Sequence, residues 1–297
     1  MKMKLTQNQK LAKEITEKLN EELYNLSDSE INKILKLHKD NRDKILNEVA
    51  KVILSYNVEN DSLNLTSTEK LKLNKKLQDK INDIFKNEAK AEMDKVTKVL
   101  KEVTLDKYYS NSYVMSLGLD FTLKKVSDKQ LDRIINNTIE GKIFSDRIWD
   151  NKNKVAKTLK LEVKKFLNGE TNLNNIEKII KDKYNSNAFN TKRLVRTETA
   201  RVMEQANEVF AKENNIEYQL FSATLDDRTS KVCSGLDGKV FKYDDTNKPV
   251  TPLHPNCRST LISLPSKDYR PKTRLNNITK ERINYKTYQD WKVEQDL

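Results

Sequence analysis

The stretch FSDRIWDNKNKVAKTLKLEVKKFLNG, residues 144–169, decides the fold class. Its apolar residues recur at spacings of three, four or seven and form one stripe along a helix: Ile148, Val155, Leu159, Val163 and Phe166. Gly169 follows directly, where a glycine commonly ends a helix. The stretch therefore predicts a long amphipathic helix.

The residues around this stretch extend the helical prediction over most of the chain. All five prolines lie beyond residue 248, and only Gly118, Gly141 and Gly169 precede residue 235. Three pairs have the spacing of a capping box at a helix start: Ser27 with Glu30, Thr66 with Glu69, and Ser127 with Gln130. We expect a mainly α fold, with an elongated helical body followed by a small C-terminal α+β module.

The pattern changes at two places. Residues 108–123 are aromatic and aperiodic, so we expect a connection there. Beyond residue 216 we expect strands over 218–224 and 259–264, and a hairpin whose turn is Asp237-Gly238. The resulting organisation is an N-terminal helical region (1–105), a basic helical middle region (106–189), a C-terminal module (190–266) and a polar tail (267–297).

Composition excludes several classes of protein. Lys and Arg number 56 against 44 Asp and Glu, a net charge of +12, and apolar residues make up 36% of the chain. No run of about 18 apolar residues occurs, so we predict no membrane-spanning helix and no membrane partner. Two cysteines cannot build a disulfide framework, which fits a protein made in a reducing cytoplasm.

Lysines of the opening stretch fall largely on the face away from its apolar stripe: Lys154, Lys157, Lys160, Lys164 and Lys165. Residues 101–200 carry 20 Lys and Arg against 13 Asp and Glu. A one-sided row of lysines is able to bind the backbone of double-stranded DNA without sequence preference, with an affinity that falls with salt. A solvated surface is the equally weighted alternative.

Both cysteines and one of the two histidines fall within 25 residues: Cys233, His254 and Cys257. These are ligands that zinc prefers, and Asp226, Asp227, Asp237 or water would supply a fourth. Two alternatives remain open, packing in a small loop-rich core and a Cys233–Cys257 disulfide. A zinc-assisted hydrolase or toxin-like effector using this cluster is the alternative function, although no oxyanion hole or hydrolase signature accompanies it.

The segment RLVRTETAR, residues 193–201, concentrates charge on one helix. The charged residues include Arg193, Arg196, Glu198 and Arg201. Spacings of three and four allow Glu198 to pair with Arg201 or with a residue of another element. We interpret the segment as a salt-bridged helix that docks on the C-terminal module. Recognition of phosphate by the guanidinium groups is the functional alternative.

Five pieces of sequence, in this order, resemble the Mu protein F-like (head morphogenesis) family of phage minor head proteins: GKIFSDRIW (141–149), FLNGE (166–170), RLVRTETAR (193–201), ATLDDRTSKVCSGLDGKVF (223–241) and PLHPNCRS (252–259). The shared positions include Asp226, Asp227, Arg228, Asp237, Gly238, His254, Pro255, Cys257 and Arg258. Many relatives carry cysteine where this chain has Ser230 and Ser259, so a family-type metal cage is depleted here.

The resemblance implies a structural protein of the virion rather than an enzyme. Such a protein lies inside the head in few copies, after assembly in the host cytoplasm, and is associated with the portal. It acts in capsid assembly and in DNA packaging or delivery. The implied partners are portal protein, capsid or scaffolding proteins and double-stranded DNA. No cofactor beyond possible zinc is implied.

Overall fold

A computed structural model describes residues 7–59, 62–116, 124–224, 226–264, 273–275, 279, 281–284 and 290. The chain forms two compact units, each assembled from separate segments. Unit 1 comprises Met1–Asp28, Val99–Asn137 and Arg196–Leu297. Unit 2 comprises Ser29–Lys98 and Thr138–Val195.

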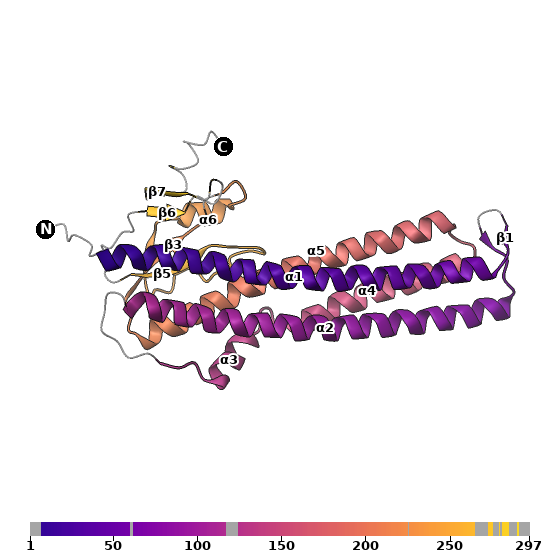
Figure 1. The fold of residues 1–297 in the computed structure, drawn as a ribbon, viewed down its shortest axis with the longest axis horizontal. Coiled ribbons are helices and arrows are strands. Elements are labelled where there is room, and N and C mark those ends of the chain that lie inside the picture. Colours follow the sequence, from indigo (N-terminus) through magenta and orange to yellow (C-terminus); the bar gives the residue numbers. More distant parts are fainter. Residues whose placement is uncertain are drawn as a thin grey trace. The chain divides into compact units, whose positions relative to one another are not determined.

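The fold is mainly α with a small α+β module near the C-terminus, as predicted (Figure 1). The helices are α1 (Gln7–Ser55), α2 (Ser67–Ser116), α3 (Asp128–Ile135), α4 (Phe144–Leu167), α5 (Leu173–Glu213) and α6 (Lys231–Leu236). The strands are β1 (Val58–Glu59), β2 (Ser62–Leu63), β3 (Tyr218–Ser222), β4 (Val240–Lys242), β5 (Thr260–Leu264), β6 (Thr273–Leu275) and β7 (Arg282–Asn284). Among the described residues, no helix is long and apolar enough to cross a membrane.

Unit 2 is a bundle of helical segments from α1, α2, α4 and α5. Its apolar core takes residues from all four segments, and the stripe of α4 predicted from the sequence is buried there. Phe85 of α2 stacks on Tyr184 of α5, with ring centroids 5.5 Å apart. Gly169, at φ +77°, lies just past the end of α4 as predicted.

Unit 1 contains a three-stranded antiparallel sheet in the order β4-β3-β5. Leu220 of the central strand lies opposite Val240 on one side and Ile262 on the other. A small apolar core surrounds the sheet, and both cysteines belong to it. A second cluster joins α2 to α5, where Tyr108 packs edge-on against Phe210.

Two of the three capping predictions are confirmed, and one is wrong. Thr66 and Ser127 make the reciprocal bonds with Glu69 and Gln130. Ser27 instead lies inside the continuous helix α1, and its buried hydroxyl bonds Thr199 Oγ1 at 2.9 Å. A long-range hydrogen bond therefore uses the hydroxyl that would have capped a helix.

Two further predictions are corrected. Helix α2 continues through residues 108–116, because the aromatic side chain of Tyr108 is buried against α5 rather than placed in a loop. The hairpin is replaced by α6, which Ser230 caps by accepting from the Cys233 amide, while β4 pairs with β3. Residues 117–123 and most of the polar tail, including Trp291, lie outside the described residues, although β6 and β7 pair antiparallel.

Candidate functional site

The Asp237-Gly238 pair closes the sheet of unit 1. Asp237 Oδ1 accepts a hydrogen bond of 2.8 Å from the amide of Ala223. Gly238 has φ +78°, a conformation that side chains with a Cβ rarely adopt, and its amide donates to the Phe221 carbonyl at 2.9 Å. These two motif residues therefore fix the turn between α6 and β4.

Asp226 holds the loop after β3. It accepts from the amide of Arg228 at 3.1 Å and from the hydroxyl of Thr229 at 3.1 Å. Its buried carboxylate also pairs with Arg258, which precedes β5. Asp226 thus joins the DDRT motif to the HPNCR motif, while Asp227 is exposed.

Arg201 of α5 is almost completely buried and has several partners. It bonds Glu198 at 2.7 Å, the pair expected from the spacing, and Gln205 at 2.7 Å. Its terminal nitrogens also donate to the carbonyls of Ile134 and Ile135, at 2.7 and 2.9 Å. The guanidinium therefore satisfies carbonyls at the end of α3.

Arg196 makes a two-pronged ion pair with another helix of unit 1. Its Nε and a terminal nitrogen donate to the two carboxylate oxygens of Asp28 on α1, each at 2.8 Å. This fork geometry fixes the direction of both side chains. The guanidinium group predicted as a possible phosphate reader is thus held by a carboxylate.

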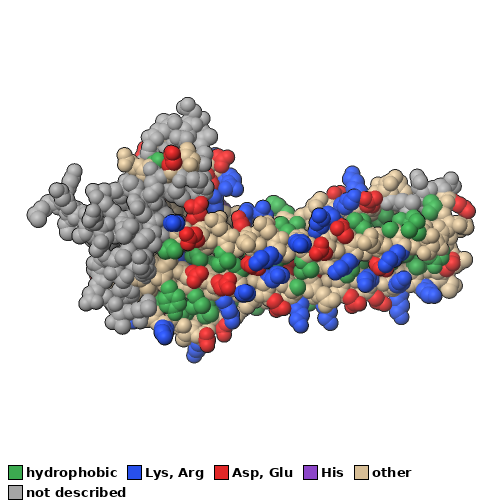
Figure 2. Space-filling model, viewed as in Figure 1, with side chains coloured by type: hydrophobic (Ala, Val, Ile, Leu, Met, Phe, Trp, Pro, Cys, Tyr) green, Lys and Arg blue, Asp and Glu red, His purple; other side chains and the backbone are tan. Residues whose placement is uncertain are grey.

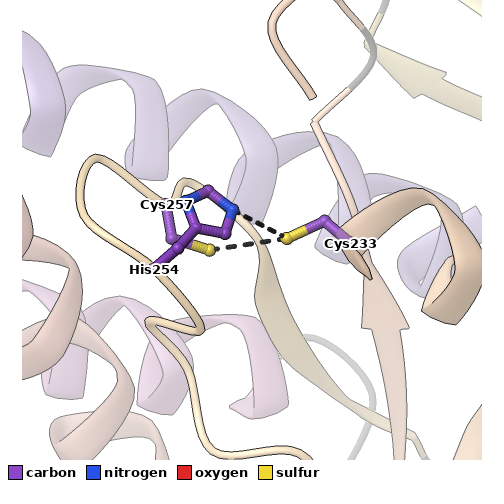
Figure 3. A group of neighbouring side chains, drawn as sticks. All are labelled: Cys233, His254 and Cys257. Carbon is purple, nitrogen blue, oxygen red and sulfur yellow. Dashed lines mark hydrogen bonds between the residues drawn. The ribbon is translucent and has the colours of Figure 1, made fainter. Parts of the chain in front are cut away.

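Cys233, His254 and Cys257 come together, with their donor atoms within 4.8 Å of one another (Figure 3). Cys233 Sγ lies 3.3 Å from His254 Nε2 and 3.7 Å from Cys257 Sγ. His254 Nδ1 donates to the Pro255 carbonyl at 3.0 Å, which leaves Nε2 directed at the cysteines. Both cysteines are free and buried.

The two thiols differ in acidity. The hydrogen bond from Cys233, backbone hydrogen bonds and the nearby His254 together lower the pKa of Cys257 to about 5, against the effect of burial. The bond to Cys257 and burial raise the pKa of Cys233. A buried thiolate with a histidine nitrogen beside it is suited to binding a soft cation.

The cluster supplies three ligands rather than four among the described residues. Asp226 and Asp237, two predicted fourth ligands, are bonded elsewhere, and neither belongs to the group of converging donors. A pocket of about 660 Å³ adjoins the cluster, with a lining that includes Tyr24, Arg196, Arg228, His254, Cys257 and Arg258. Burial raises the pKa of the Tyr24 phenol.

The predicted lysine row lies in unit 2, on α4. Lys154, Lys157 and Lys164 are exposed, whereas Lys160 and Lys165 are half-buried. Lys165 pairs with Glu162 at 2.9 Å. On the visible face of the molecule, Lys and Arg side chains lie among Asp and Glu side chains (Figure 2).

Sequence reasoning missed a second polar cluster, formed by His38, Glu88, Glu92 and Lys152 in the interior of unit 2. A signal was present, because Glu88 and Glu92 occupy positions of the α2 stripe that otherwise holds Ile81, Phe85 and Val96. Charged residues on an apolar face indicate a buried polar network.

The fold and the Cys–His cluster define a mainly α protein with a small motif-bearing sheet. The family model described as Phage Mu protein F like protein matches residues 157–262, from α4 to β5, and confirms the resemblance seen in the sequence. The family suggests phage head morphogenesis as a minor capsid protein of the virion, and it is typically structural. Neither the curated proteins nor the solved structures searched include a match.

Proposed function

We propose that this chain is a minor capsid protein inside the phage head, associated with the portal and acting in capsid assembly and in DNA packaging or delivery. The observation that carries the proposal is the family match over residues 157–262. The motif residues within that span make structural contacts: Asp226 and Asp237 fix loops, and Arg201 holds α3. Such roles fit a structural protein better than an enzyme.

Quantitative mass spectrometry of DNA-filled particles and empty proheads tests the location. We expect a few copies per particle in both, because a minor capsid protein enters the head before packaging. Absence from both preparations would contradict the proposal. Enrichment in filled particles alone would contradict entry before packaging.

Association with the portal is tested on purified components. We expect the full chain to co-migrate with portal oligomers in size-exclusion chromatography and to remain bound at moderate salt. Free capsid and scaffolding proteins serve as competing partners in the same assay. Binding to these with no binding to portal would redirect the proposal to another head protein.

Contact with double-stranded DNA is proposed through the exposed lysines of α4. The triple variant K154E/K157E/K164E should weaken retardation of any duplex and reduce its salt dependence, because three phosphate contacts are lost. The matched control is K72E/K75E/K76E, which makes the same change of charge at exposed lysines of α2. An equal loss in both variants would indicate net charge rather than a site on α4.

We also propose that Cys233, His254 and Cys257 hold one zinc ion, as a structural centre of the C-terminal module. The two sulfurs and His254 Nε2 converge, and the bond from His254 Nδ1 orients the ring. Soft thiolates and imidazole suit zinc, and a water or an outside donor would complete four ligands. The metal would link α6 to the loop before β5.

Metal content and free thiols of the purified chain test this centre together. We expect one zinc per chain in the wild type and in Ser230→Ala, which removes a helix cap and no ligand. Cys257→Ser and His254→Ala should lose the metal. A metal-free wild type with two free thiols would indicate simple core packing, and one with none would indicate a disulfide.

A further inference from the structure

Four helices of unit 2 meet around a fully buried polar cluster. Its members are distributed over α1 (His38 and Asn41), α2 (Glu88 and Glu92), α4 (Lys152) and α5 (Asn187 and Thr191), and each is at most 5% exposed. Burying two carboxylates and an ammonium group is costly unless they satisfy one another. The arrangement of their partners therefore shows what the cluster holds.

The ammonium of Lys152 lies at the centre of the cluster. Its Nζ is 2.9 Å from Glu88 Oε1, 2.5 Å from Glu92 Oε2 and 3.1 Å from Asn187 Oδ1. An ammonium group has three N–H donors, and these three oxygens accept them. His38 Nε2 also lies 2.8 Å from Nζ and 2.8 Å from Glu92 Oε2, so this ring nitrogen contacts both the ammonium and a carboxylate.

The groups around the ammonium are those of a metal site. The donor atoms of His38, Glu88 and Glu92 lie within 4.8 Å of one another. One imidazole nitrogen and two carboxylates form a ligand set that suits divalent transition metals. Carboxylates and histidines projecting into a helical bundle commonly build such centres. Here the central position is taken by the chain's own cation.

Neutral donors orient the carboxylates without help from Lys152. Asn41 Nδ2 donates to Glu88 Oε2 at 2.8 Å, and Asn187 Nδ2 donates to Glu88 Oε1 at 2.9 Å. Thr191 Oγ1 donates to Glu92 Oε1 at 2.9 Å. Each carboxylate is thus anchored from a second helix, as metal-binding carboxylates are by their outer contacts.

Both carboxylates lie against the ammonium of Lys152 in the closed interior of unit 2, where an unpaired charge is costly. A positive charge must therefore remain beside them for the bundle to close.

We propose that the ammonium of Lys152 is a built-in cation occupying a divalent-metal cage, so that unit 2 closes without metal and a divalent ion takes this place only when the ammonium is removed. The proposal is independent of the role in the phage head. It assigns the cluster a ligand class, a cation coordinated by oxygen and nitrogen.

The variant K152A, which removes the cation and leaves space, tests the proposal with Mn²⁺ as the probe. Manganese favours carboxylates and imidazole over thiolates, so Cys233 and Cys257 do not compete. We expect K152A to melt at a lower temperature than the wild type without metal, and Mn²⁺ to restore its melting temperature. Electron paramagnetic resonance should count one bound Mn²⁺ per chain in K152A and none in the wild type.

Two controls separate the site from general effects. K154A alters an exposed lysine of the same helix and should gain no Mn²⁺. K152A/E92A retains the space but loses a ligand, and it should also bind none. Metal-free K152A that is as stable as the wild type, or folded K152A that ignores Mn²⁺, would overturn the proposal.

A third variant covers failure of K152A to fold. K152M/E88Q/E92Q removes the cation and both charges together, so it should fold without metal and ignore Mn²⁺. If this neutral variant also fails to fold while K154A folds, packing rather than charge balance is responsible, and the proposal is wrong. Stoichiometric Mn²⁺ in the wild type would be equally incompatible with it.

Discussion

Each unit buries a lysine, but the two lysines have different surroundings. In unit 2, Lys152 contacts two carboxylates directly. In unit 1, Lys107 is equally buried and donates to the neutral side chain of Asn20 at 2.8 Å. Burial lowers the pKa of Lys107 to about 8, and the more distant charge of Glu204 only partly opposes this effect.

Glu204 completes the contrast. Burial raises its pKa, although Thr260, Asn207 and the backbone amide of Leu261 donate hydrogen bonds to its carboxylate. In unit 1, Glu204 and Lys107 are thus each bonded by neutral groups, whereas in unit 2 the buried acids and the lysine join in one network. The difference teaches that a buried charge stabilises a fold only through the partner it touches.

Replacing each lysine by methionine should separate the two cases most strongly. Lys152→Met leaves two buried carboxylates without their cation and should lower the free energy of unfolding by about 3–5 kcal/mol. Lys107→Met removes a cation held by one neutral acceptor and should cause no loss. Urea unfolding of both variants measures the two changes in the free energy of unfolding. Equal losses in the two variants would contradict the prediction.

Alkaline pH should stabilise unit 1 through Lys107. The unfolded chain keeps this proton up to its usual pKa of 10.5, but the folded chain only up to about 8. Stability should therefore rise between pH 8 and 10.5, by roughly 3 kcal/mol. The measurement is wild-type stability minus that of Lys107→Met across this range, and a flat difference would contradict the prediction.

Acid should act on unit 2 through Glu92. Its pKa falls from 4.5 to about 2 on folding, so its contribution is complete above pH 4.5 and is lost as the pH falls towards 2. The expected loss is about 3 kcal/mol. Glu92→Gln lacks this ionisation, and its stability should vary less over the same interval in acid titrations followed by circular dichroism.

Two glycines provide a comparison with a small expected effect. Gly169 in unit 2 and Gly238 in unit 1 have φ of +77° and +78°. Substituting alanine at either should cost about 1 kcal/mol, because an L-residue with a Cβ is strained there. Hydrogen exchange read by mass spectrometry should show faster exchange in the substituted unit.

Local pattern was enough to predict the elements that depend on neighbours in sequence. The stripe of α4, the caps at Thr66 and Ser127, and the strands β3 and β5 all follow from residues within one turn or one strand. Spacing and capping chemistry act over these short distances, so the sequence contains the whole signal.

Long-range contacts account for the errors. Ser27 bonds Thr199, and Tyr108 packs on Phe210, so partners about a hundred or more residues away decide their local structure. The hairpin prediction failed because the Ser230 cap favours a helix over a strand. The sequence predicted that Cys233, His254 and Cys257 come together. It could not show that Asp226 and Asp237 do not serve as a fourth ligand, because that depends on the bonds they make to other residues.

Arg201 limits which sequences this fold tolerates. Its planar guanidinium group donates hydrogen bonds to Glu198, Gln205 and two carbonyls of α3, although the side chain is almost completely buried. A lysine there would offer one nitrogen in place of a fork. In a library of all amino acids at this position, arginine alone should survive selection for folding. Even Arg201→Lys, which keeps the positive charge, should be lost from the library.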